Sequence, residues 1–274
     1  GLAGMFIIDD DISKNLSLPS DYGVDDFPVI IQDKNFNKDG SFEYLADVRD
    51  KLMGQKGETI LVNGIISPVM KATKSLIRLR LLNGSNARIF HLNFDDKRMF
   101  HIIASDGGLL ENPVMAHSIT LAPAERAEIL VDVSDGKMPI LRHKMHMQKS
   151  ANRMSGMMMM ESMQGKKQEF DIFQIDASHA TPSHHKVPST LTIHAPLPVK
   201  SVSNQRRFKL QMQMGPQLML GAMMGSQDLL KINGQSMDIN RIDEVVKAGS
   251  VELWEIENTS MMPHPFHIHN VQFK

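Results

Sequence analysis

Short alternations of apolar and polar residues recur along the chain, and they restrict its fold more than any other feature. Residues 77–81 alternate in this way and end at a turn signal, Asn-Gly, at 83–84. Residues 90–94 and 129–133 repeat the pattern. A period of two is typical of a strand with one buried face, so 77–81 is expected to be half-buried. Because long helical periodicity is missing, the sequence predicts an all-β protein built from sandwiches or barrels.

The composition excludes several classes of partner. The 274 residues are 42% hydrophobic with a formal net charge of −1, and they contain no long basic run. This balance argues against nucleic acid and anionic membranes as partners. No apolar stretch approaches the length of a membrane span. The absence of cysteine excludes disulfides and thiolate metal sites within this chain.

Three histidines, His264, His267 and His269, lie within six residues near the end of the sequence. On an extended strand His267 and His269 point to the same side, about 7 Å apart along the chain. His264 is an odd number of steps from His267, so it should point to the other side. One short segment would then serve two metal sites. Imidazole binds copper, zinc, iron and nickel, so the cluster alone does not name the metal. A surface loop with a chance cluster is the alternative.

Methionine is unusually frequent, with 22 residues. Met is a flexible filler of cores, which explains scattered examples. The stretch 143–163 is different, because its methionines are mixed with polar and turn-forming residues. Thioethers favour Cu(I), so we interpret this stretch as a Cu(I)-handling loop, with core filling as the alternative. Its four consecutive methionines are Met157, Met158, Met159 and Met160.

A change in composition at 178–204 predicts the domain organisation. This stretch is rich in Pro, Ser, Thr and His, which is typical of a linker with solvated histidines. Residues 1–177 would form one β domain carrying the Met-rich loop at about 143–168. Residues 205–274 would begin another, but they are fewer than the roughly 100 that a Greek-key sandwich needs. Both ends of the chain read as interrupted strands, so we expect a piece of a longer protein.

Several motifs in this chain resemble those of the multicopper oxidases, most closely the periplasmic cuprous oxidases of bacterial copper resistance. Each motif is weak alone, but they follow one another in the order typical of that family. They are the residues 1–10, 25–34, 78–88, 104–108, 231–235 and 264–269.

This resemblance implies a fold of cupredoxin-like Greek-key sandwiches, with the second of three domains complete and the third partial. It implies copper as the cofactor, with His264 at the type 1 site, His267 at type 2 and His269 at the type 3 pair. Substrate electrons enter at type 1, and dioxygen is reduced to water at the trinuclear cluster. The family's other histidines and its cysteine have no counterpart here, so this chain alone is expected to be inactive.

The resemblance also implies a substrate site for Cu(I), and phenols are further possible substrates. Met262 matches one of the family's copper-binding methionines, and Met214 and Met219 lie in the matching region. Ser260 stands where relatives carry Asp, so the family's site is not reproduced. The partners implied are Cu(I), dioxygen, and the first domain and remainder of the third domain, all in the periplasm.

Two other functions stay open. Some relatives keep the scaffold, lose the copper ligands and serve as structural or division proteins. A Cu(I)-binding module without turnover would also explain the methionines. Retention of His264, His267 and His269 favours the oxidase, because a scaffold protein has no need of them.

Overall fold

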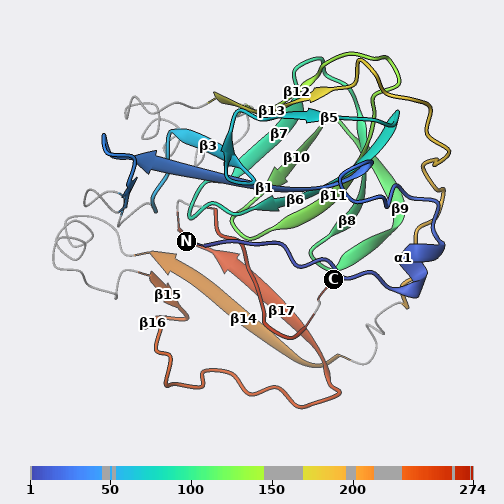
Figure 1. The fold of residues 1–274 in the computed structure, drawn as a ribbon. Helices are drawn as coiled ribbons and strands as arrows, with labels where there is room; N and C mark the ends of the chain where they lie inside the picture. Colours follow the sequence, from blue (N-terminus) through green and yellow to red (C-terminus); the bar gives the residue numbers. More distant parts are fainter. Residues whose placement is uncertain are drawn as a thin grey trace.

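The structure, a computed structural model, describes residues 2–44, 50, 54–144, 169–195, 202–212, 230–260, 263–271 and 273. These residues are almost entirely strand and loop, so the all-β prediction is confirmed (Figure 1). A short helix, α1 (Asp11–Asn15), is capped by Asp10, whose carboxylate accepts from the Ser13 N–H at 2.7 Å. No helix in the described residues is long and apolar enough to cross a membrane.

The described residues form three sheets, of eight, five and four strands. The first contains β1 (Asp26–Phe36), β2 (Phe42–Glu43), β3 (Thr59–Val62), β4 (Ile65–Ile66), β6 (Leu76–Asn83), β8 (Phe100–Ser105), β9 (Gly108–Ala116) and β11 (Arg126–Asp132). The second contains β5 (Val69–Lys71), β7 (Phe90–Phe94), β10 (Ser118–Leu121), β12 (Ile140–Lys144) and β13 (Glu169–Asp176). The third contains β14 (Val202–Met212), β15 (Leu230–Ile232), β16 (Gln235–Ser236) and β17 (Val251–Asn258).

The first two sheets pack face to face as a sandwich. Its core joins the inward residues of β6 and β11 to those of β7, with Ile77, Leu79, Phe90, Leu92 and Ile129 all fully buried. The strands predicted at 77–81, 90–94 and 129–133 are therefore confirmed. Burial of these side chains is the main favourable contribution to folding.

Strand β6 is buried on both faces, so the expectation that it is half-buried is wrong. The outward residues Arg78 and Arg80 are only 4% and 8% exposed. Arg80 Nη2 lies 2.7 Å from Asp26 Oδ2 on β1, and its Nη1 lies 3.0 Å from Glu128 Oε1 on β11. Arg78 also pairs with Glu128. Partners on both neighbouring strands make it possible to bury these guanidinium groups.

The described part of the predicted linker, 178–195, lies against the sandwich. Thr181 and Ser75 share a backbone hydrogen bond of 2.8 Å, and Leu191 is 2% exposed in a second apolar cluster with Leu18 and Leu130. His194 Nε2 lies 2.8 Å from the Leu109 carbonyl oxygen. This segment covers the outer face of the first sheet, which Figure 1 shows in gold, so its histidines are not all solvated.

The third sheet repeats an arrangement found in the first. Asn63 and Asn233 both have φ of 51° and precede a glycine in a tight hairpin. Asn63 Oδ1 accepts from the Ile30 N–H at 2.9 Å, and its Nδ2 donates to the Pro28 carbonyl at 2.9 Å. Asn233 makes the same two bonds, accepting from Lys209 N–H at 2.8 Å and donating to the Arg207 carbonyl at 3.0 Å.

The repeat extends to the strand that follows each hairpin. β6 pairs in parallel with β1, and β17 pairs in parallel with β14. The order β4-β3-β1-β6 thus matches β16-β15-β14-β17. In the first sheet β11 continues on the far side of β6, whereas β17 pairs only with β14 among the described residues. The third sheet therefore corresponds to strands β4, β3, β1 and β6 of the first sheet.

His143 lies in the core and not in a loop. It belongs to β12 and is 3% exposed, which corrects the sequence interpretation that the Met-rich loop begins at this residue. Its Nδ1 accepts from the His91 N–H at 3.0 Å, and its ring stacks on Phe170 with centroids 6.1 Å apart. Burial, with the nearby charge of Arg88, lowers the pKa of His143 to about 4.

The asparagine hairpin is a testable source of stability. Asn63→Ala should lower the free energy of unfolding by about 2–3 kcal/mol, because it removes two hydrogen bonds and strains a positive φ. Asn63→Gly should cost about 1 kcal/mol less, since glycine tolerates the backbone conformation. Urea unfolding would measure both. Equal stability of Asn63→Gly and the unaltered protein would show that the side-chain bonds contribute nothing.

The buried imidazole predicts a pH dependence of stability. The unfolded state has the higher His143 pKa, near 6.5, so it binds more protons as the pH falls from about 6.5 to about 4. The protein should lose up to about 3 kcal/mol across this window from His143 alone. His143→Asn keeps an acceptor near the Nδ1 position and cannot titrate, so urea unfolding should show a shallower loss. An unchanged pH slope in that variant would contradict the assignment.

Candidate metal centre

The three histidines follow the end of β17 in a segment that is not a strand. Burial nevertheless alternates along it: His264, Phe266 and Ile268 are half-buried, whereas His267 and His269 are exposed. The expected strand is therefore absent, but His264 is less exposed than the other two histidines.

Aromatic packing holds this segment on the third sheet. The Phe266 ring lies 6.2 Å from that of Phe208 and 6.5 Å from that of Trp254, measured between centroids. Phe208 and Trp254, on β14 and β17, are themselves 4.6 Å apart. Such contacts favour one orientation of the ring as well as its burial. Since Phe266 is fixed inward, His267 next to it is directed outward.

His264 lies in a partly desolvated position beside Ser260. Its Nε2 is 2.9 Å from Ser260 Oγ. Burial lowers the pKa of His264, so the imidazole is neutral at pH 7. A neutral imidazole has one nitrogen lone pair available to a metal ion.

His267 and His269 lie together on the exposed side. Their ring centroids are 4.9 Å apart with an interplanar angle of 73°. Within the described part of the chain, no three His, Cys, Asp or Glu side chains are grouped as a metal site. These two histidines would therefore need ligands from elsewhere to complete a metal coordination shell.

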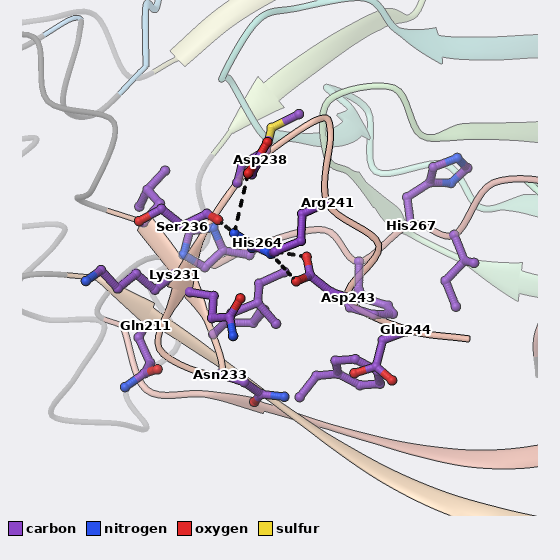
Figure 2. Close-up of a pocket in the computed structure, with 18 of the residues that line it drawn as sticks. Gln211, Lys231, Asn233, Ser236, Asp238, Arg241, Asp243, Glu244, His264 and His267 are labelled. Atoms are coloured by element: carbon purple, nitrogen blue, oxygen red, sulfur yellow. Dashed lines mark hydrogen bonds and ion pairs between the residues drawn. The ribbon is translucent and has the colours of Figure 1, made fainter. Parts of the chain in front are cut away.

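The histidine segment borders an open cavity of about 960 Å³, which the third sheet lines. His264, His267 and His269 all line this cavity, and Figure 2 shows His267 at some distance from His264. The lining carboxylates of Asp238 and Asp243 face Arg241, which lowers the pKa of Asp243 through a direct hydrogen bond. Glu244 pairs with Arg206. Because these carboxylates are paired with arginines, imidazole is the group in this cavity with the clearest metal-binding role.

The predicted Cu(I)-binding methionines cannot be placed. They lie outside the described residues, as does the loop from 145 to 168. These residues are Met157, Met158, Met159, Met160, Met214, Met219 and Met262.

The donors present fit copper in part. Imidazole nitrogens suit copper, and His264 offers one in a partly desolvated setting. A blue type 1 site also needs a thiolate, and the sequence contains no cysteine. Sequence reasoning missed Asn258, whose side chain accepts a hydrogen bond from the Ser260 hydroxyl. Its position six residues before His264 could have pointed to this contact.

The chain resembles known proteins along its whole length. The multicopper oxidase family model matches residues 202–274. The chain is 36% identical over its whole length to cell division protein FtsP of Rahnella sp. (strain Y9602), covering 53% of that protein. It is 37% identical over its whole length to multicopper oxidase mco of Staphylococcus haemolyticus, covering 50%. The chain thus spans about half the length of the curated relatives it matches.

Solved structures give the same result. The laccase-like multicopper oxidase CueO from Ochrobactrum sp. matches with a TM-score of 0.77 at 30% identity, over 95% of this chain and 55% of that one. McoA from Aquifex aeolicus matches with a TM-score of 0.77 at 31% identity, over 98% and 56%. In sequence and in its cupredoxin-like fold the chain is thus similar to multicopper oxidases, and residues 202–274 match the model of that family.

Proposed function

We propose that the full-length protein is a copper-dependent oxidase that oxidises Cu(I), and also phenols, with dioxygen as the acceptor. Its setting would be copper tolerance in the periplasm. One observation carries this proposal: within a single short segment His264 is half-buried, whereas His267 and His269 are exposed with their rings 4.9 Å apart. That division suits a segment shared between two copper sites.

The chain's own residues would have distinct tasks. His264 would bind the type 1 copper, and half-burial would limit the access of water to it. His267 would bind the type 2 copper and His269 one copper of the type 3 pair. Phe266 would keep the two sites on opposite sides by anchoring the segment to Phe208 and Trp254. The bound coppers would supply electron transfer from substrate to dioxygen.

Similarity to proteins named FtsP supports a second candidate, a non-catalytic scaffold that serves in cell division. In that function the three histidines would have no metal to bind. A Cu(I)-binding module without turnover is the remaining alternative, and it rests on the methionine-rich sequence. The oxidase would consume oxygen when Cu(I) is supplied, whereas neither alternative would.

The test is oxygen consumption by the copper-loaded full-length protein with Cu(I) as the substrate. An oxidase should consume oxygen in proportion to the Cu(I) supplied. Copper binding without oxygen consumption would favour the binding module, and absence of both would favour the scaffold. Either result would overturn the proposed oxidase.

Substitutions in the full-length protein should separate the two copper sites. His264→Ala should abolish the blue absorption band, because it removes a type 1 ligand. His267→Ala should lower oxygen consumption by about 100-fold or more while leaving the band, because its ring binds a different metal. His117→Ala, at an exposed histidine between β9 and β10, should change neither. Equal bleaching by His264→Ala and His267→Ala would disprove the division.

A further inference from the structure

Two strands at one end of the first sheet carry methionine and histidine side chains next to each other. β8 and β9 are antiparallel neighbours, and β9 ends the strand order of that sheet in the described residues (Figure 1). His101 on β8 is paired directly with Met115 on β9, one step from the pair Phe100 and Ala116. Met99 comes immediately before β8. Two thioethers and one imidazole therefore lie close together across two strands.

The alternation of side chains puts these three groups on one face of the sheet. Phe100 is 1% exposed in the main core, and Ala116 packs against that core. Successive side chains of a strand point to opposite faces, so Met99, His101 and Met115 face away from the core. The exposed fractions agree, since Met99 is 40% and Met115 is 57% exposed.

The spacing of the strands brings the three donors within reach of one ion. Side chains directly opposite each other, as at His101 and Met115, have Cβ atoms about 4.5–5.5 Å apart. Met99 lies two residues from His101, about 7 Å along the strand. A methionine side chain has three rotatable bonds, so both sulfur atoms can turn toward the imidazole. On the other side of His101 lies Leu130 of β11, which is fully buried, so the site has one apolar wall.

The surroundings leave the donors available. Within the described residues, the His101 ring takes part in no hydrogen bond or ion pair. Arg98 directly precedes Met99, but its guanidinium is paired with Asp96 at 2.6 Å and with Asp135 at 3.1 Å. Its positive charge is therefore balanced and does not oppose a cation on this face.

We propose that Met99, His101 and Met115 form a binding site for Cu(I), separate from the histidine segment after β17. Thioether sulfur selects Cu(I), and imidazole also suits copper, whereas Zn(II) would find only one good ligand here. His117 is not part of the site, because it lies at a bend from which the chain continues into β10 of the second sheet.

NMR spectra of the whole chain, with its methionine methyl groups labelled, test the site residue by residue. Cu(I) added without oxygen, in the presence of a competing chelator, should shift the Met99 and Met115 methyl signals and the His101 ring signals with one midpoint. Zn(II) at the same concentration should leave both methyl signals in place. Unshifted methyl signals at saturating Cu(I), or different midpoints for Met99 and Met115, would overturn the proposal.

Substitutions at the site distinguish the paired strands from a nearby histidine. Met115→Leu keeps the side-chain volume, so the fold should be retained. It should weaken Cu(I) binding, read at the Met99 methyl group, by about 100-fold, since losing even an outer partner of a metal ligand costs about 10–100-fold. His101→Gln should weaken binding similarly, whereas His117→Ala is the matched control and should bind normally. Equal weakening by His101→Gln and His117→Ala would contradict the proposed ligand set.

This site does not depend on the proposed oxidase. If Cu(I) shifts the three residues together in a protein that consumes no oxygen, the site is supported and the oxidase fails. If the protein consumes oxygen with Cu(I) but these signals do not shift, the oxidase is supported and the site is wrong.

Discussion

The parallel pairing of two central strands is the constraint on which the rest of the structure depends. Parallel partners cannot be joined by a tight turn, so β1 and β6, like β14 and β17, are joined through long intervening segments. In each pair an asparagine hairpin bonds to the first strand, and a backbone bond closes the end of the second. Because both repeats use the same bonds, the register of β17 is set in the same way as that of β6.

The register of β17 in turn determines where the metal-binding segment starts. Thr259 is bonded to β14, so Asn258 and Ser260 are held at a defined place beside His264. Six residues after Ser260, Phe266 packs against Phe208 and Trp254. These two attachments flank His264, which is half-buried, whereas His267 and His269 beyond Phe266 are exposed. The geometry of the site follows from sheet pairing and aromatic packing.

Sequence reasoning predicted the features that depend on local periodicity. The sandwich strands at 77–81, 90–94 and 129–133 were predicted because one face of each is continuously apolar. Burial of Arg78 and Arg80 was missed, since their partners Asp26 and Glu128 come from strands distant in sequence. The spacing of His264, His267 and His269 was read on the assumption of a strand, and no strand forms there. The contacts of Ser260 with Asn258 and His264 depend on the three-dimensional structure, which no spacing rule contains.

The central claim is that the histidine segment belongs to a protein that binds copper at two different kinds of site. Electron paramagnetic resonance of the oxidised full-length protein, combined with its copper content, tests this claim most directly. We predict bound copper with two distinct signals, one typical of a thiolate-bound type 1 centre and one of a type 2 centre. A full-length protein that binds no copper after loading, or that shows a single kind of centre, would contradict the account.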